Sequence, residues 1–219
     1  MTIQKNSIPE AYNGPMVSLQ NIHKTFNPHS VNELTIFENF NLDILKDQFI
    51  SVIGSNGSGK TTILNLLCGS LPVDGGKILV KGQNITKMKE FQRARFIGRV
   101  FQDPSKGTCP ELTILENMAM AEAKDKHFGL TFGVNRKRLD FYKSQLELLK
   151  LGLEDKLHIQ VGSLSGGQRQ ALALLIATMT PIDLLVLDEH TAALDPKSAD
   201  NVMRLTDQFV KEKHLTALM

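Results

Sequence analysis

The residues best placed for chemistry form the glycine-rich stretch Gly54-Ser55-Asn56-Gly57-Ser58-Gly59-Lys60-Thr61, and the next residue is Thr62. The stretch matches the phosphate-binding pattern G-x-x-x-x-G-K-[ST]. Its glycines let successive backbone N–H groups turn toward phosphate oxygens, and a helix that begins at Lys60 adds its positive dipole end. The Lys60 ammonium would neutralise the β- and γ-phosphates, and the Thr61 hydroxyl would ligate Mg²⁺. The alternative is a flexible glycine loop without a ligand, and the flanking elements weigh against it.

A second candidate group is the acidic pair Asp188-Glu189, which directly follows the apolar run Leu184 to Leu187. Carboxylates at the carboxyl end of a parallel strand face the ligand crevice of an open α/β sheet. Asp188 would orient Mg²⁺ and its waters, and Glu189 would polarise an attacking water as a general base. Alone, such a pair is more often a helix cap. Together with the glycine-rich stretch, it favours a catalytic role.

These residues need a sheet and helices to hold them. The runs Phe49 to Ile53 and Leu184 to Leu187 are almost continuously apolar, which is typical of parallel strands covered on both faces. Apolar residues recur at helical spacing between Thr61 and Leu67, and Gly69 follows as a C-cap. The order strand, glycine loop, helix is the context that the phosphate-binding pattern requires.

The later parts of the chain predict further helices. From about Asp103 to Val161 strand signals are absent, which indicates a helical insertion packed on the sheet. Asp195 and Pro196 have the residue types of an N-cap and a first helical position, and that helix should end near Lys213.

Composition limits the class of protein. The chain has 219 residues, of which 42% are hydrophobic and 22% charged, which is typical of one folded soluble unit. A formal net charge of +2 is too small to indicate a nucleic-acid surface. The longest apolar stretch, around Ala171 to Met179, is far shorter than the ~20 residues of a membrane span. Met1 to Gly14 lacks the apolar core of a secretory signal, and Cys68 and Cys109 have no metal-type spacing, so we expect a cytoplasmic protein.

The stretch Leu164-Ser165-Gly166-Gly167-Gln168 resembles the LSGGQ signature of ABC ATPases, and it lies between the phosphate motif and the acidic pair, as in that family. Ser165 can cap a helix that runs to Met179 and so leave N–H groups and a positive dipole end for an anion. The resemblance implies a RecA-like α/β P-loop NTPase core with an antiparallel β subdomain and an inserted helical lobe. It also implies a head-to-tail homodimer, in which this signature closes over the γ-phosphate of the ATP held by the partner's P-loop.

Other positions match the same family. Gln102 is similar to the Q-loop glutamine that senses Mg²⁺ and the γ-phosphate, and Ala193-Leu194-Asp195 is similar to the D-loop that crosses the dimer interface. Phe26 stands where the family places an aromatic residue that stacks on adenine, with a core position as the alternative. The resemblance implies a single ABC ATPase domain over 1–219, with an ATP-binding core at 1–102 and 165–219 and a helical lobe at 103–164.

One family element is missing from this sequence. In the family, a switch histidine follows the strand after the D-loop helix. Here the resemblance implies that this strand is Leu215 to Met219, where the sequence stops. We therefore expect a C-terminally truncated domain that binds ATP better than it hydrolyses it. His190 and His214 are interpreted as surface or loop histidines and not as substitutes.

The resemblance favours the motor subunit of a bacterial transporter, peripheral on the inner face of the cell membrane. The runs Phe101 to Ala121 and Asp188 to Lys197 resemble importer ATPases that work with a branched-chain-amino-acid-type permease and an extracytoplasmic substrate-binding protein. An amino acid is then the expected cargo. A soluble cofactor-assembly ATPase is the alternative. A DNA-repair head would need a coiled-coil insertion, a translation-linked member would need a second cassette, and a guanine-reading motif is not supported.

Overall fold

The computed structural model describes residues 12–55, 57–124 and 133–219, so Asn56 and most of the segment from Met1 to Gly14 lie outside the described residues. The chain divides into two compact units, Met1–Arg93 and Ala94–Met219. Each unit contains strands and helices, and each carries part of the predicted site.

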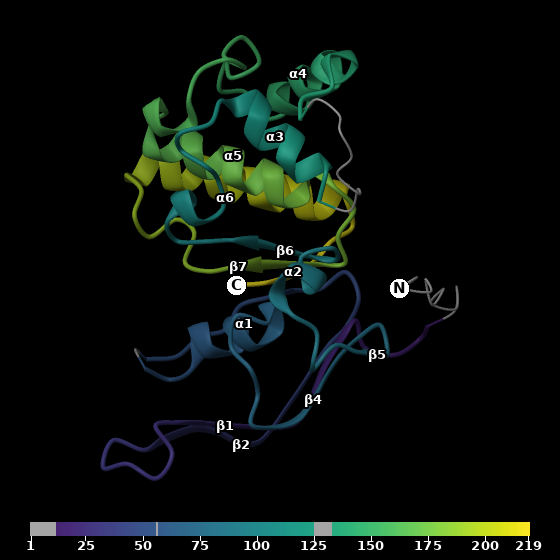
Figure 1. Ribbon diagram of the computed structural model, residues 1–219, viewed down its shortest axis with the longest axis vertical. Helices are drawn as coiled ribbons and strands as arrows, with labels where there is room; N and C mark the ends of the chain where they lie inside the picture. Colours follow the sequence, from purple (N-terminus) through teal and green to yellow (C-terminus); the bar gives the residue numbers. More distant parts are fainter. Residues whose placement is uncertain (1–11, 56, 125–132) are drawn as a thin grey trace. The chain divides into compact units, whose positions relative to one another are not determined.

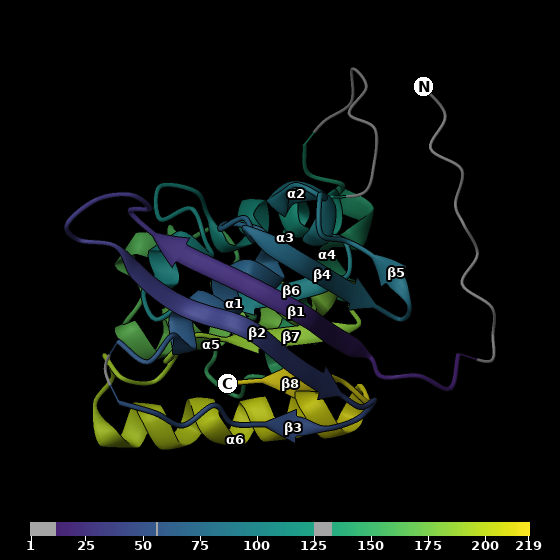
Figure 2. The same cartoon turned by 90° about the horizontal axis from the view of Figure 1, so that it is seen from below.

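The first unit contains an antiparallel sheet of strands β1 (Val17–Phe26), β2 (Leu34–Ile44), β4 (Gly75–Val80) and β5 (Gln83–Asn84). Their order is β2-β1-β4-β5, and β1 and β2 form its long ribbon (Figure 2). The apolar residues Val17, Leu19 and Ile22 of β1 are buried, whereas Gln20 and Asn21 are exposed, so the strand contributes to a covered core and also reaches solvent. This sheet is the antiparallel β subdomain that the resemblance implied.

The phosphate motif of the first unit precedes helix α1 (Lys60–Cys68), whose apolar residues are buried. Gly69 ends the helix in the left-handed conformation, with φ 83°, and its N–H donates to the Asn65 carbonyl, which confirms the predicted C-cap. The short helix α2 (Glu90–Arg93) closes the unit. The predicted strand Phe49 to Ile53 is wrong in extent: β3 is Phe49–Ile50, and 51–55 have no regular structure. Pairing partners decide where a strand ends, and an apolar run does not encode them.

The second unit contains the parallel strands β6 (Ile97–Val100), β7 (Leu184–Leu187) and β8 (Thr216–Leu218), with β7 in the middle. Every residue of β7 is 0% exposed, as its continuous apolar run predicted. The bounds of β7 are those read from the sequence, and β8 lies within the predicted last strand, Leu215 to Met219.

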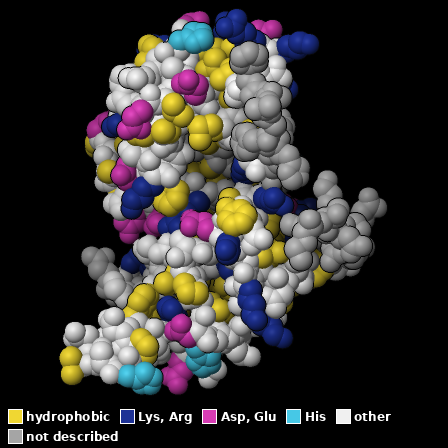
Figure 3. All heavy atoms as spheres, viewed as in Figure 1, with side chains coloured by type: hydrophobic (Ala, Val, Ile, Leu, Met, Phe, Trp, Pro, Cys, Tyr) yellow, Lys and Arg dark blue, Asp and Glu magenta, His cyan; other side chains and the backbone are white. Residues whose placement is uncertain are grey.

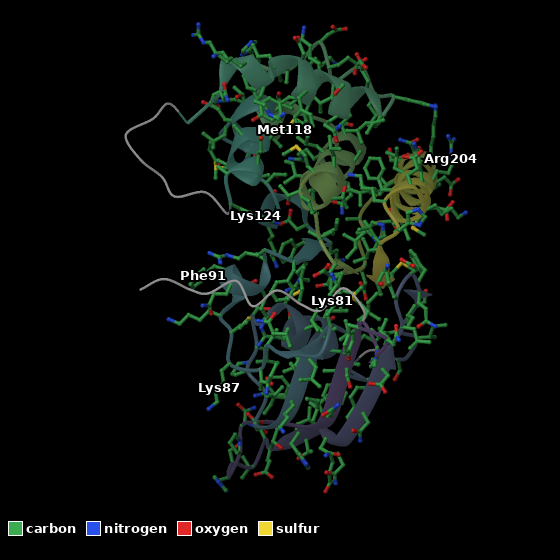
Figure 4. All side chains as sticks on the ribbon, turned by 90° about the vertical axis from the view of Figure 1, so that its right-hand side faces the viewer. Lys81, Lys87, Phe91, Met118, Lys124 and Arg204 are labelled. Atoms are coloured by element: carbon green, nitrogen blue, oxygen red, sulfur yellow. The ribbon has the colours of Figure 1, made fainter. Side chains whose placement is uncertain are left out.

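The described residues of the second unit form the helices α3 (Ile114–Glu122), α4 (Leu139–Glu147), α5 (Gly166–Met179) and α6 (Pro196–Glu212). They also form the short 3-10 helices η1 (Pro104–Lys106), η2 (Arg136–Arg138) and η3 (Val161–Ser163). The α-helices lie on one side of β6 and β7, with α5 and α6 next to the strands and α3 and α4 farther out (Figure 1). One hydrophobic core joins the helices to the strands, and Met118 is buried in it (Figure 4).

Within the described ranges, no helix is both long enough and apolar enough to cross a membrane. On the face drawn in Figure 3, described lysine and arginine side chains are interspersed with aspartate and glutamate. This face therefore carries charges of both signs.

Candidate functional site

The backbone of the phosphate loop depends on two glycines in the left-handed region. Gly57 has φ 81° and Gly59 has φ 93°, where a side chain is strained. A Cβ on Gly59 would also lie 2.7 Å from Ile36 Cγ2 and 2.9 Å from Phe37 Cζ, whereas a Cβ on Gly57 would meet nothing within 4 Å. Gly59 is therefore required twice, by its dihedral angle and by the strand β2 beneath it, and Gly57 once.

Lys60 lies over this loop. Its ammonium donates to the Gly54 carbonyl at 2.7 Å and to the Ser55 carbonyl at 2.9 Å. Both acceptors are loop backbone, so the charge is held beside the N–H groups that begin α1. Thr61 is exposed in the first turn of the helix and Thr62 is half-buried. The loop thus brings together the Lys60 ammonium, the N-terminus of α1 and the exposed Thr61 hydroxyl. These are groups that can bind a phosphate.

The far end of α1 is anchored by Arg93, which the sequence did not single out. Its side chain is 2% exposed and donates to the Leu66 and Leu67 carbonyls at 2.6 and 2.9 Å, which belong to the last turn of α1. It also donates to the carbonyls of Thr86 and Met88. Burial lowers the pKa of Arg93, but arginine keeps its charge in proteins. A cation at the C-terminal end of α1 interacts favourably with the negative end of the helix dipole. Arg93 therefore stabilises the helix that carries Lys60.

Phe26, the predicted adenine-stacking residue, is half-buried at the end of β1. The buried Lys24 ammonium lies 5.6 Å from its ring centroid and 2.8 Å from Asp74 Oδ1. Asp74 Oδ2 also accepts from the Thr25 N–H at 2.7 Å, and these two bonds hold the pKa of Asp74 below its usual value. The adjacent ion pair thus fixes the backbone that presents Phe26, and its adenine contact stays a prediction.

Asp188 and Glu189 leave the carboxyl end of β7 as the sequence predicted. Asp188 is half-buried, and its Oδ2 accepts from Arg99 Nη2 on β6 at 2.8 Å. Glu189 is exposed and has a positive φ of 44°. A non-glycine residue in this region is strained, and such strain gathers at functional sites. The two carboxylates therefore differ: one is held by an ion pair and the other is presented to solvent by a strained turn.

Gln102 follows β6, two residues beyond Val100, and Val100 pairs with Leu187, the residue before Asp188. Because β6 and β7 are parallel neighbours, Gln102 and Asp188 both follow the carboxyl ends of the strands, on the same side of the sheet's end. The start of this segment is fixed by Gln170 of α5, which is 0% exposed and donates from Nε2 to the Phe101 carbonyl at 2.9 Å. Sequence reasoning missed Gln170, although its place directly before the apolar run that begins at Ala171 is a signal that could have marked it.

The predicted signature segment begins α5 as expected. Ser165 is the N-cap, and its hydroxyl accepts from the Gln168 N–H at 3.3 Å. Gln168 Oε1 accepts in return from the Ser165 N–H at 3.1 Å, which completes a capping box. Gln168 therefore stabilises the helix start, a local role that the sequence reading did not include. The positive end of a fourteen-residue helix stands behind the exposed Ser165.

The predicted D-loop residue Asp195 caps α6, with its carboxylate accepting from the Ser198 N–H at 3.1 Å. The hydrogen bonds from Ser198 hold the pKa of Asp195 below its usual value. A Cβ added to Gly167 would lie 2.7 Å from Ser198 Oγ and 2.8 Å from Ser198 Cβ. The signature and the D-loop segment are thus neighbours, because a glycine lets the first turns of α5 and α6 approach closely.

His190 corrects one expectation. It stands in a turn, as predicted, but it is 1% exposed and so does not lie on the surface. Its Nε2 lies 3.1 Å from Thr206 Oγ1, and that hydroxyl donates to the Val202 carbonyl. Burial lowers the pKa of His190 to about 4. The turn after the acidic pair folds back onto α6, which sequence spacing does not encode. His214, in contrast, is exposed in a turn.

Comparisons with known proteins identify the family of this chain. The family model described as ABC transporter matches residues 37–192, so the chain belongs to the ABC transporter family. The chain is an ATP-binding cassette with ATPase activity as its enzyme class. The resemblance read from the signature segment is therefore confirmed, as is the fold class.

Two relatives and one solved structure illustrate the family. A tyrosine transport ATP-binding protein of Clostridioides difficile is 43% identical over 93% of this chain and 81% of its own length. A ribose import ATP-binding protein of Streptococcus agalactiae is 30% identical over 90% of this chain, which spans 38% of that relative. A dimeric ATP-binding cassette bound to ADP and Pi has a TM-score of 0.76 and 27% identity, covering 93% of this chain and 86% of its own.

Proposed function

We propose that this chain is the ATP-hydrolysing motor subunit of a bacterial ABC importer of a small solute, with an amino acid as the class of cargo. The observation that carries the proposal is the 43% identity, over 93% of the chain, to a tyrosine transport ATP-binding protein. The phosphate loop, the acidic pair and the capped signature helix support it, because together they supply the groups for ATP binding and hydrolysis.

The phosphate loop is proposed to bind ATP. Gly54 to Thr62 would direct backbone N–H groups and the Lys60 ammonium at the β- and γ-phosphates, for which Lys60 would leave the Gly54 and Ser55 carbonyls that it now contacts. Phe26 would stack on adenine.

The available donors fit Mg²⁺. The Thr61 hydroxyl, the Gln102 amide oxygen and the Asp188 carboxylate are hard oxygen ligands, which Mg²⁺ prefers, along with water and phosphate. No cluster of three or more histidine, cysteine or acidic side chains suited to a metal occurs in the described residues, which fits an ion held largely by substrate and water. When bound, Mg²⁺ would supply charge neutralisation at the phosphates.

Glu189 is proposed to accept a proton from the attacking water. Its carboxylate is exposed at the end of β7, and a general base must lie within hydrogen-bond reach of that water.

The signature helix is proposed to act in a head-to-tail homodimer. Ser165, Gly166 and Gly167 begin α5 and offer a helix N-terminus to the γ-phosphate that a second copy holds, with Gln168 capping the helix and Asp195 at the interface. The ATP-binding core would be formed by 1–102 and 165–219. The helical lobe, 103–164, would contact a membrane permease. An extracytoplasmic binding protein would deliver the cargo to that permease. In this arrangement the subunit would lie on the cytoplasmic face of the membrane.

Size-exclusion chromatography of a Glu189→Gln variant tests the ATPase part of the proposal. The variant should form a dimer with Mg²⁺ and ATP and remain a monomer without them, because binding is kept while hydrolysis is blocked. Lys60→Ala is the matched control, and it should stay monomeric. A Glu189→Gln variant that binds ATP but never dimerises would contradict the proposed sandwich.

Affinity purification from detergent-solubilised membranes tests the transport part. We expect a stoichiometric partner with several membrane spans. Their complex should hydrolyse ATP faster in the presence of a binding protein loaded with an amino acid. Co-purification with soluble enzymes of cofactor assembly would support the alternative class.

A further inference from the structure

The carboxylate proposed to orient Mg²⁺ already has a cationic partner within its own unit. Arg99 Nη2 donates to Asp188 Oδ2 at 2.8 Å, and the two side chains are 12% and 15% exposed. Arg99 lies opposite Val186 in the β6–β7 register. Because side chains alternate along a strand, Arg99, Val186 and Asp188 share one face of the sheet.

That face is the one not covered by α5. A Cβ on Gly98 would lie 2.6 Å from the Ala177 carbonyl of α5, so the side of β6 that Gly98 faces has no space for a side chain. Arg99 projects from the opposite side. Its guanidinium lies 4.5 Å from the Phe101 ring centroid, which orients the planar group toward the end of β7. The pair is therefore arranged by the strand register and by one aromatic neighbour.

The charges give this pair a consequence. Asp188 and Glu189 are consecutive acids, and in the absence of a metal the nearby Arg99 compensates the less exposed of the two. A cation that approaches Asp188 meets a guanidinium of the same sign, which opposes its binding. A low-exposure ion pair of this kind is screened little by salt.

We propose that Arg99 is the resident counter-cation of Asp188, a positioning residue that holds this carboxylate before the nucleotide is loaded and raises the Mg²⁺ concentration that loading requires. The inference rests on the proposed role of Asp188 in orienting Mg²⁺. Arg99 touches neither substrate nor reacting atoms in this scheme, and it acts through Asp188.

The test is the Mg²⁺ dependence of nucleotide binding by the full chain, followed with a fluorescent, non-hydrolysable ATP analogue. Arg99→Gln should lower the Mg²⁺ concentration at half-maximal binding by about 3- to 10-fold, because a neutral residue no longer opposes the ion. Arg99→Lys, which keeps the charge, should remain close to wild type. Arg204→Gln is the matched control: Arg204 is exposed on α6 of the same unit (Figure 4), and its loss should leave the midpoint unchanged.

A double-mutant cycle separates this role from general packing. In an Asp188→Asn background, Arg99→Gln should no longer shift the Mg²⁺ midpoint, since the coupled carboxylate is gone. Should Arg99→Gln fail to fold by circular dichroism, Arg99→Met keeps the apolar stem and carries the same expected shift.

The outcomes distinguish this inference from the proposed function. A wild-type protein whose nucleotide binding ignores Mg²⁺ would overturn the metal role of Asp188, and this inference with it. A Mg²⁺-dependent wild type, with a folded Arg99→Gln variant whose midpoint is unchanged or higher, would overturn the counter-cation alone.

Discussion

The phosphate loop of the first unit and the acidic pair of the second meet similar chemical demands with different parts of the chain. In the loop, the groups proposed to bind phosphate are mostly backbone N–H groups, and glycine decides whether they can turn toward it. At Asp188 and Glu189 they are side chains, placed by the end of β7, and Arg99 already contacts one of them. A backbone site is damaged by adding a methyl group, whereas a side-chain site is damaged by changing a single atom.

The largest contrast is expected from Glu189→Gln. Replacing one carboxylate oxygen by an amide removes the proposed base, so ATP turnover should fall by about 10²- to 10⁴-fold, while ATP affinity stays within a few-fold. Steady-state phosphate release and equilibrium binding measure the two quantities separately.

Lys60→Ala completes this comparison from the loop side. It should weaken ATP binding itself, because the phosphates lose their cation. Equal losses of binding in the two variants would show that the assigned roles are wrong.

A smaller effect, on stability, is expected from the turn that follows the acidic pair. Burial lowers the pKa of His190 from 6.5 to about 4. Because the folded-state pKa lies below that of the unfolded chain, the unfolded state binds the proton first as the pH falls. The free energy of unfolding should therefore decrease between about pH 6.5 and pH 4, by on the order of 3 kcal/mol, and then level off.

Urea denaturation at several pH values measures this slope. A His190→Gln variant has no titrating group at the site, so its stability should vary less with pH over the same window. His214→Gln, which alters an exposed histidine, is the control. Equal slopes in wild type and His190→Gln would exclude His190 as the source.

Alanine substitutions at two glycines of the phosphate loop should differ in their effect on stability. Gly59→Ala combines an unfavourable φ of 93° with contacts of 2.7 and 2.9 Å to β2, so it should lower the free energy of unfolding by about 2–3 kcal/mol and weaken ATP binding. Gly57→Ala has the strained φ without the contacts and should cost about 1 kcal/mol. Thermal unfolding with and without ATP compares them. Equal destabilisation would mean that packing on β2 does not matter.

An effect smaller than that of Gly59→Ala is expected where a glycine sets the approach of two helices. Gly167→Ala would force Ser198 away and should cost about 1–2 kcal/mol and weaken ATP-dependent dimerisation. Gly166→Ala, whose Cβ would lie at an ordinary 3.5 Å from Leu194, is the matched control for the free energy of unfolding. Adding Ser198→Gly to Gly167→Ala should restore dimerisation, as measured by sedimentation. Persistence of the defect would place the effect of Gly167 elsewhere.

Several elements could be read directly from the sequence because their signals are local. The C-cap at Gly69, the N-caps at Ser165 and Asp195 and the apolar run of β7 each depend on residues within one turn or one strand. The strand before the phosphate loop was overestimated for the opposite reason: β3 ends at Ile50 because hydrogen-bond partners, and not composition, set its length.

The sequence by itself determined the phosphate loop, the acidic pair and the signature segment, since each is a contiguous motif whose geometry follows from its own backbone. Only the tertiary structure placed Arg93 on the last carbonyls of α1, Arg99 on Asp188, and Gln170 on the Phe101 carbonyl. It also buried His190 against α6. These contacts join residues far apart in the chain, where strand register and helix packing decide which side chains meet, and no local pattern records that choice.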